Sequence, residues 1–382
     1  MKTIRFGIIG AGLMAREFAS ASARWCHLNG SPARPEIVGV CDQNPAGLDW
    51  FKAHFPSVGQ YTPDYRELLA NKEIDAVYAA VPHHLHEEIY GATIRAGKHL
   101  MGEKPFGIDL PANSAILQAM GKTSFVRCSS QFPFFPAMQR MGGMVEARAF
   151  GRILEANTGF LHSSDLDPAK PINWKRIVET NGEYGVLGDL GMHACHLPFR
   201  AGWQALNVRA ILSNIVTERP DGKGGMAPCK TWDNATLLCE ALDPADGFHF
   251  PWTLKTQRIA PGQKDTWYAE IIGTKACARW SSASPNVLQL LEYTGGEQSY
   301  RTVETGYTPA YKTITGANFE FGFTDAILQM WAAFLNELAT GKLPSKFAGC
   351  ATPAEANLSH RLFTAALESE KTGETRLVKN AA

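Results

Sequence analysis

A glycine-rich turn close to the N-terminus constrains the fold of this chain more than any other feature. The segment Gly10–Ala15 reads Gly-Ala-Gly-Leu-Met-Ala; it follows the apolar run Ile4–Ile9 and precedes an amphipathic stretch. This is the strand–turn–helix context that a dinucleotide-binding fingerprint requires, although a simple glycine turn is the alternative. The first glycine permits a tight turn, the second admits a pyrophosphate, and the helix N-terminus supplies N–H donors. We therefore expect cofactor contacts from Gly10, Gly12, Leu13, Met14 and Ala15.

Apolar runs alternate with amphipathic stretches through the first 130 residues, which is typical of βαβ units that build a parallel sheet. In the first predicted helix, Met14, Phe18, Ala21 and Trp25 share one face that is expected to pack on the sheet. The predicted strands are Ile4–Ile9, Ile37–Cys41, Ala76–Val81, His99–Gly102 and Ser124–Cys128. The predicted helices are Leu13–His27, Ala46–Phe55, Asp64–Ala70, His86–Ala96 and Pro111–Met120.

The pattern changes after Gly151, where longer strand-like runs are joined by Gly, Pro and Asp turns. Because consecutive antiparallel strands need only short turns, the runs predict a mainly antiparallel sheet. They are Leu206–Val216, Ala235–Leu242, Trp252–Ile259, Tyr268–Ala278 and Asn286–Tyr293. Helices are predicted at Phe323–Ala339 and Thr352–Lys371, and Thr352 with Glu355 fits a capping box.

Together these patterns predict an α/β Rossmann domain over residues 1–130 and an α+β domain over residues 131–382. The second domain is expected to hold a large, open, mainly antiparallel sheet flanked by helices, to bind substrate and to form the subunit contacts. Its final helix can pack back on the Rossmann domain. One sheet face is expected to need cover, which predicts a homodimer or homotetramer.

The composition excludes several classes of function. Lys plus Arg and Asp plus Glu number 37 each, so no basic field attracts nucleic acid or anionic lipid. No segment approaches the roughly 18 apolar residues of a membrane-spanning helix, and the N-terminus is interpreted as a strand rather than a secretory signal. Eight cysteines without a C-x-x-C pair favour free thiols in a reducing compartment. We therefore expect a cytoplasmic protein with a small-molecule ligand.

An acidic residue follows the second predicted strand. Asp42 stands where a ribose diol would bind, and its charge would repel the 2′-phosphate of NADP. No Arg or Lys within residues 43–47 compensates, so the sequence predicts NAD over NADP. The distance from Ala15 to Asp42 exceeds the usual spacing of about 20 residues, and the loop Asn29–Pro32 can absorb the excess. A surface carboxylate at a strand end is the alternative for Asp42.

Three further segments carry polar residues at element ends. Gly97–Pro105 ends in Glu-Lys-Pro, Val81–His86 reads Val-Pro-His-His-Leu-His, and Gly188–His193 reads Gly-Asp-Leu-Gly-Met-His. They resemble the E-K-P, T-P-N-x-x-H and D-x-G-x-H segments of the Gfo/Idh/MocA family of NAD(P)-dependent sugar oxidoreductases, in the family's order. The resemblance implies hydride transfer between NAD and a sugar or cyclitol, with Lys104, Asp189 and His193 as catalytic residues.

The chemistry of hydride transfer gives each of these three residues a task. Oxidation of a carbinol requires a base for the hydroxyl proton and a donor for the oxygen. His193 is the natural base, which predicts an activity that rises through a pKa of roughly 6–8. Lys104 can donate to the reacting oxygen, and Asp189 can orient the imidazole or bind a neighbouring hydroxyl. The alternative for each residue is a solvated or structural polar group.

The resemblance also places residues around the nicotinamide and the substrate. His83, Gln131 and His196 depart from the Asn, Asn and Asp that the family often has at these positions. Glu103 is expected to shape the cofactor turn, with a cis bond before Pro105. Trp174 offers an aromatic face for a sugar ring. The further cofactor contacts expected are Pro82, His83, His86, Glu103, Lys104 and Gln131, and the substrate contacts expected are Lys104, Trp174, Asp189, His193 and His196.

Histidines crowd two segments, at His83–His86 and at His193 with His196, but no acidic or Cys ligand set accompanies them at metal-site spacing. We therefore expect no metal. The leading hypothesis is an NAD-dependent sugar or cyclitol dehydrogenase. The alternatives are an NAD-dependent glycoside hydrolase that oxidises its sugar transiently, and a nucleotide-sensing regulator without activity. The loop at residues 219–227 is interpreted as a surface excursion.

Overall fold

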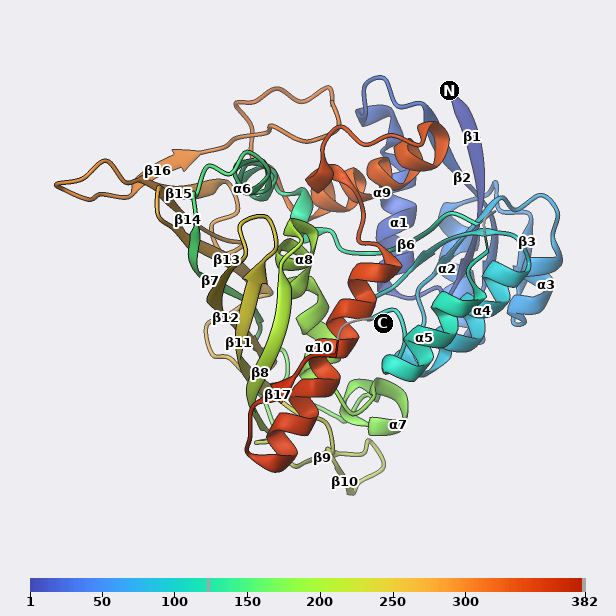
Figure 1. The fold of residues 1–382 in the computed structure, drawn as a ribbon. Coiled ribbons are helices and arrows are strands. Elements are labelled where there is room, and N and C mark those ends of the chain that lie inside the picture. The colour runs from blue at the N-terminus through green and yellow to red at the C-terminus, as the bar shows by residue number, and fades with distance from the viewer. Residues whose placement is uncertain (122–123, 380–382) are drawn as a thin grey trace.

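Two β-sheets organise the part of the chain that the computed structural model describes, residues 1–121 and 124–379 (Figure 1). The N-terminal sheet is parallel, with strand order β3-β2-β1-β4-β5-β6. Because the order reverses between β1 and β4, the carboxyl ends of these two strands form the crevice where open α/β sheets bind ligands. The strands are β1 Lys2–Ile9, β2 Ala33–Cys41, β3 Gln60–Thr62, β4 Ala76–Ala79, β5 His99–Gly102 and β6 Val126–Cys128.

The helices of this first part fall near their predicted positions. One helix and one strand differ from the prediction. The first helix ends at Ala23, and the 3₁₀ turn Trp25–His27 follows it as a separate element. Strand β3 was not predicted, because three residues are too few to show a period. The helices are α1 Leu13–Ala23, α2 Pro45–His54, α3 Tyr65–Ala70, α4 His86–Arg95 and α5 Leu110–Ala119.

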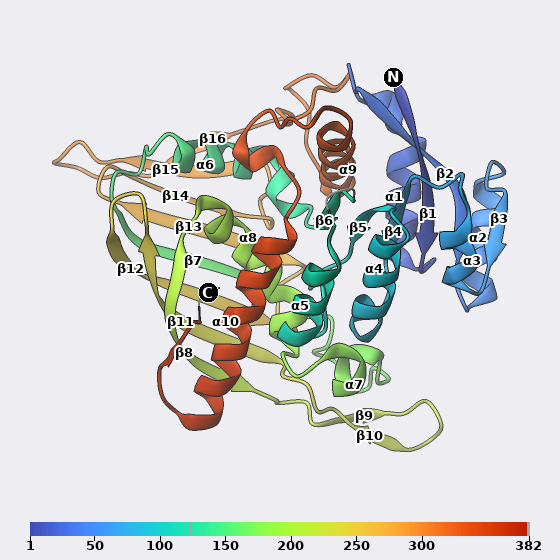
Figure 2. The ribbon, with the colours of Figure 1, turned by 45° about the vertical axis from the view of Figure 1, so that its right-hand side comes forward.

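A helix from the far end of the chain completes the core of this sheet. Helix α9, Phe323–Thr340, packs against α1 and β2. The ring of its Trp331 stacks on Phe18 of α1 at 3.8 Å and meets Phe6 of β1 at 5.7 Å. Both views place α9 beside α1 (Figures 1 and 2). The apolar face of α1 is thus covered by α9 as well as by its own sheet.

The second sheet is mainly antiparallel, as predicted, with order β16-β15-β14-β13-β7-β12-β11-β8-β17. The predicted strand Tyr268–Ala278 is wrong, because the chain turns at residues 274–275 and forms the hairpin β13–β14. Strand β7 was not predicted; it lies at the centre, parallel to β12 and antiparallel to β13. The strands are β7 Ile153–Leu161, β8 Gln204–Ser213, β11 Asn234–Asp243, β12 Phe248–Gln257, β13 Thr266–Gly273, β14 Ala276–Ser281, β15 Val287–Glu292, β16 Arg301–Glu304 and β17 Arg376–Leu377.

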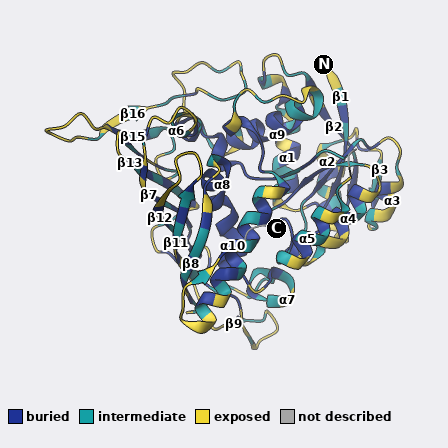
Figure 3. Cartoon of the chain, viewed as in Figure 1, coloured by how far each residue is buried: buried dark blue, intermediate teal, exposed yellow. Residues whose placement is uncertain are grey.

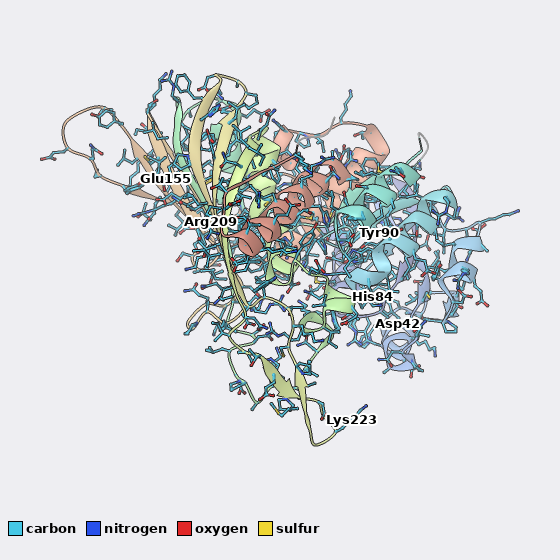
Figure 4. The ribbon with its side chains drawn as sticks, turned by 60° about the horizontal axis from the view of Figure 1, so that its bottom comes forward. Asp42, His84, Tyr90, Glu155, Arg209 and Lys223 are labelled. Atoms are coloured by element: carbon cyan, nitrogen blue, oxygen red, sulfur yellow. The ribbon has the colours of Figure 1, made fainter. Side chains whose placement is uncertain are left out.

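Helices cover one face of this sheet. They are α6 Pro136–Glu146, α8 Met192–Ala201 and α10 Pro353–Thr372, and α8 is almost wholly buried (Figure 3). The opposite face carries exposed apolar side chains, including Ile211 at 65% and Leu238 at 52% exposure. Glu155 of β7 and Arg209 of β8 lie on the same sheet (Figure 4). The short elements α7 Val178–Asn181, β9 Glu218–Pro220 and β10 Met226–Pro228 lie at one end.

The final helix connects the two parts of the molecule. It begins with the predicted capping box, in which Thr352 Oγ1 accepts from the Glu355 N–H at 3.2 Å. Asn357 of α10 donates to Asn113 of α5 at 2.8 Å, and His360 Nε2 donates to the Pro105 carbonyl at 2.8 Å. Figure 2 shows α10 between the large sheet and α5. None of the described helices is long and apolar enough to cross a membrane.

Candidate active site

The glycine turn after β1 has the geometry that a pyrophosphate needs. Gly10 has φ +89°, and a Cβ there would lie 2.3 Å from the Ala80 carbonyl oxygen, so only glycine fits. A Cβ on Gly12 would meet nothing within 4 Å, which leaves room for a ligand against the backbone. Helix α1 has no side-chain cap and no acidic residue in its first turn. Its N-terminal N–H groups are therefore suited to phosphate oxygens, and the turn fits a dinucleotide.

Asp42 follows β2 beside this turn, in the N-terminal part labelled in Figure 4. One carboxylate oxygen accepts from the Ala11 N–H at 2.6 Å, and the other accepts from the Asn44 N–H at 2.7 Å. These bonds fix the carboxylate next to the glycine turn, and each oxygen has a further lone pair for a ribose hydroxyl. The side chain is only partly buried, so a ligand can reach it.

The predicted nicotinamide-side turn is built from Pro82 and a 3₁₀ turn at His83–Leu85. The His83 ring is buried, shares a hydrogen bond with the Asn181 carbonyl at 3.0 Å and meets the Trp174 ring edge-on at 4.9 Å. Both ring nitrogens of His86 are engaged by backbone: Nε2 with the Val81 carbonyl and Nδ1 with the Gly107 N–H. The ring therefore supports the turn, and a cofactor contact from His86 stays a prediction.

Strand β5 ends at Gly102 and delivers Glu103 and Lys104 to the same edge of the sheet. The buried Glu103 carboxylate accepts from the Tyr78 hydroxyl at 2.6 Å, which agrees with a role in shaping the turn. The Lys104–Pro105 bond is cis, as the resemblance implied. Lys104 itself points across to the segment before α8.

Asp189 is the centre of a group of cations. The Lys104 ammonium donates to its carbonyl at 2.7 Å and to its Oδ1 at 2.9 Å. The Lys175 ammonium donates to Oδ1 at 3.0 Å and to Oδ2 at 3.1 Å. Arg258, directly after β12, reaches Oδ2 at 3.4 Å. The carboxylate is 1% exposed and both of its oxygens are occupied by cationic donors.

These cations determine the protonation of Asp189. Burial by itself would raise its pKa, but Lys104, Lys175 and Arg258 outweigh burial and hold the pKa well below its ordinary value. The carboxylate is therefore ionised throughout the neutral range. It cannot accept a proton from a carbinol at neutral pH.

His193 lies one turn further along, in the buried helix α8. Its Nδ1 shares a hydrogen bond with the Ser130 hydroxyl at 3.1 Å, and the rings of Phe132 and Phe160 meet it edge-on at 5.3 and 5.5 Å. Among the described residues, the hydrogen bond that orients this ring comes from Ser130, and the carboxylate of Asp189 is bonded to cations instead. Ser130 holds the ring at Nδ1 and leaves Nε2 for a substrate.

The protonation of His193 also differs from the expectation of a pKa between 6 and 8. Burial, followed by the positive charge of Lys104, lowers the pKa of His193 well below its ordinary value. The imidazole is therefore neutral at pH 7 and able to accept a proton.

The remaining predicted substrate residues lie around this group. Trp174 and Lys175 belong to the 3₁₀ turn Trp174–Arg176, next to His83 and Asp189. His196 is buried, and neither of its ring nitrogens has a hydrogen-bond partner among the described residues. Gln131 is buried at the start of the 3₁₀ turn Phe132–Phe134. Which of these residues contact cofactor or substrate stays a prediction.

Sequence reasoning missed three polar residues of this site as participants: Ser130, Lys175 and Arg258. Ser130 and Lys175 each adjoin a residue that was singled out, Gln131 and Trp174, and that adjacency was the available signal. Arg258 had none, because it reaches Asp189 from the end of β12, whose position depends on its pairing with β7.

Comparison with known proteins identifies the class of protein and a family that the N-terminal part of the chain matches. Residues 4–131 match a family described as "Oxidoreductase family, NAD-binding Rossmann fold". Together with the glycine turn at the switch point of a parallel sheet, this match defines the protein as an NAD-binding oxidoreductase. The matched family is the Gfo/Idh/MocA family that the sequence resembles, and the two sheets confirm the predicted fold class.

Two named dehydrogenases are similar in sequence over part of the chain, and a solved structure of one of them shares the fold over the whole chain. Levoglucosan dehydrogenase of Pseudarthrobacter phenanthrenivorans is 26% identical over 328 residues, 81% of this chain and 82% of that protein. Glucose-6-phosphate 3-dehydrogenase of Bacillus subtilis is 27% identical over 222 residues, 57% of this chain and 60% of that protein. A solved structure of levoglucosan dehydrogenase in complex with NADH and L-sorbose has a TM-score of 0.88 at 24% identity, covering 100% of both chains.

Proposed function

We propose that this oxidoreductase transfers hydride between NAD and a secondary hydroxyl of a sugar or cyclitol. The observation that carries the proposal is the arrangement of Lys104, Asp189 and His193 at the edge of the sheet where β5 ends. It combines a neutral, oriented imidazole with an ammonium group. Relatives named as dehydrogenases of levoglucosan and of glucose 6-phosphate support the substrate class.

The residues divide the chemistry between them. Bound NAD supplies the hydride acceptor. His193 takes the hydroxyl proton at Nε2, while Ser130 holds the ring at Nδ1. Lys104 has three N–H donors, and Asp189 engages two of them among the described contacts, which leaves one for the substrate oxygen. Asp189 keeps Lys104 in position through these two bonds.

A panel of sugars and inositols with NAD, monitored for NADH formation, tests the proposal. We expect net, stoichiometric NADH with at least one neutral polyol or sugar acid, and loss of the signal with His193→Ala. A glycoside hydrolase would instead release a leaving group without net NADH. No NADH from any member would overturn the proposal.

We also propose that Asp42 selects NAD over NADP. Its fixed carboxylate lies beside the glycine turn and would repel a 2′-phosphate. Asp42→Ala should weaken the preference for NAD. At saturating substrate, kcat/KM measured with NAD divided by kcat/KM measured with NADP should fall. An unchanged ratio would show that Asp42 serves only the turn that it caps through Ala11.

Three further proposals concern the molecule as a whole. We propose a Rossmann domain over residues 1–130 and a substrate-binding domain over residues 131–382. A homodimer or homotetramer is supported by the exposed apolar residues Leu154, Ile211 and Leu238 on the uncovered face of the large sheet. Light scattering that shows only monomer at micromolar concentration would overturn it. A cytoplasmic location is supported by free thiols at all eight cysteines.

A further inference from the structure

Positive charge at the site exceeds what the proposed hydride transfer requires. Asp189 has Lys104, Lys175 and Arg258 around it. Arg258 also approaches Asp165 at 3.8 Å, and that carboxylate is already paired with Lys170 at 2.8 Å. Two carboxylates, Asp189 and Asp165, are thus shared by four cations: Lys104, Lys175, Arg258 and Lys170. The chain as a whole has no net charge, so this excess is local.

The neighbouring histidines do not change this balance. Burial lowers the pKa of His83, His162 and His193, so all three are neutral at pH 7. No other carboxylate among the described residues is paired with Lys104, Lys175 or Arg258. Excess cations in a partly buried group are unfavourable until an anion joins them.

The accessible part of this group is the pair of lysines. The side chains of Lys104 and Lys175 are 18% and 39% exposed, whereas those of Asp189 and Arg258 are 1% exposed. Both ammonium groups bond to Asp189 Oδ1, so they lie within two hydrogen-bond lengths of each other. Each has three N–H donors, and Asp189 engages two on each. Two adjacent cationic donors therefore face the substrate space, where the reaction oxygen needs only one.

We propose that Lys175 is a specificity-determining residue that binds an anionic substituent, a carboxylate or a phosphate, on the sugar or cyclitol that this enzyme oxidises. The inference rests on the proposed function and narrows its substrate class. Lys104 serves the reacting oxygen, and Lys175 forms a charge-assisted hydrogen bond with the acidic group. Trp174, the preceding residue, lies where its ring can contact the C–H face of the same sugar.

The experiment compares matched pairs of substrates that differ only in the acidic group: glucose with glucuronate, glucose with glucose 6-phosphate, and galactose with galacturonate. We expect kcat/KM with NAD to favour the acidic member of at least one pair by roughly 10- to 100-fold, the range for a hydrogen bond to a charged group. A preference for the uronates would show that the site binds a carboxylate, and a preference for glucose 6-phosphate would show that it binds a phosphate.

Variants then assign the preference to Lys175. Lys175→Gln should raise KM for the acidic member roughly 10- to 100-fold more than KM for the neutral member, with a much smaller difference between the two in kcat. Lys175→Arg should retain the preference for the acid because it keeps the charge. Lys223→Gln, at the tip of the β9–β10 hairpin far from the site (Figure 4), is the control for loss of one positive charge and should change neither substrate.

The outcomes separate the inference from the proposed function. Neutral sugars that are oxidised as efficiently as their acids overturn the inference and leave the dehydrogenase intact. Equal losses for both members of a pair with Lys175→Gln also overturn it, since Lys175 then only positions Asp189. Absence of NADH from every compound overturns the proposed function and the inference with it.

Discussion

At Asp189, the surrounding cations fix the protonation of a buried carboxylate. Because three cations keep it ionised, it cannot compete with His193 for a proton at neutral pH. The imidazole, in turn, is kept neutral by burial and by the charge of Lys104. Asp189 thus stays ionised and His193 stays neutral because these two residues, four positions apart, lie in unlike environments.

Replacing Lys104 or His193 by Ala is expected to lower turnover by roughly 10² to 10⁴, the usual effect of losing acid–base assistance. Affinity for NAD should change little, because Gly10, Gly12 and Asp42 lie at the other end of the cofactor crevice. Steady-state kinetics and fluorescence titration with NADH check the two parts. Full activity in both variants would contradict the proposed chemistry, and loss of NADH binding would mark the residues as structural.

The pH dependence of oxidation follows from the lowered pKa of His193. An imidazole that is already neutral loses no proton between about pH 6 and pH 8, so kcat/KM should show no histidine limb there. Activity should fall only at lower pH, where the ring becomes protonated. The measurement is kcat/KM across this range in buffers of constant ionic strength. A limb centred near neutral pH that His193→Ala abolishes would contradict the assignment.

At the scale of elements, the sequence predicted the helices, strands and turns that are determined by residues close together in the chain. The glycine turn, the capping box of α10 and strand β5 lie where periodicity and turn chemistry placed them. Strand β7 was not predicted, and its position between β12 and β13 depends on pairing with distant segments. The hairpin at residues 274–275 was missed because only Gly273, Thr274 and Lys275 interrupt an apolar run that resumes at Ala276.

The same distinction applies to the site. Lys104, Asp189 and His193 were found because each lies in a recognisable segment. Lys175 and Arg258 reach Asp189 only after the 3₁₀ turn and β12 are assembled around it. Nothing in the spacing of these residues along the chain encodes that contact.

The contribution of α9 to the N-terminal core gives a test at this scale. Trp331→Ala should lower the free energy of unfolding by about 3–5 kcal/mol, because it removes a fully buried ring that stacks on Phe18. Urea denaturation followed by circular dichroism measures the loss. Trp50→Ala, at a half-buried tryptophan of α2, is the matched control and should cost much less. Equal losses would mean that α9 is not part of that core.

At the scale of the whole molecule, buried histidines link stability to pH. Burial lowers the pKa of His86 to about 3 and those of His196 and His360 to about 4. Their pKa in the unfolded chain is higher, near 6.5, so the unfolded state binds more protons as the pH falls below that value. Stability is therefore fully present above about pH 6.5 and is lost towards pH 4.

Each such histidine should reduce the free energy of unfolding by about 1.4 kcal/mol per pH unit within this window. Denaturant unfolding at a series of pH values measures the slope. His360→Gln keeps a donor for the Pro105 carbonyl. It should lower the slope by about 1.4 kcal/mol per pH unit, the contribution of one proton. His54→Gln, at an exposed position on α2, is the control and should leave it unchanged. A slope that is independent of His360 would contradict this account.

The position of Trp331 against Phe6 and Phe18 also bears on how the protein is made. A ribosome releases these three residues far apart in time, since synthesis proceeds at roughly 5–20 residues per second. The helix that covers the first sheet is therefore synthesised on the order of half a minute after the first strands of that sheet. We expect the nascent chain to present an apolar surface during that interval, so that chaperone binding to ribosome-bound chains ends only after α9 has emerged.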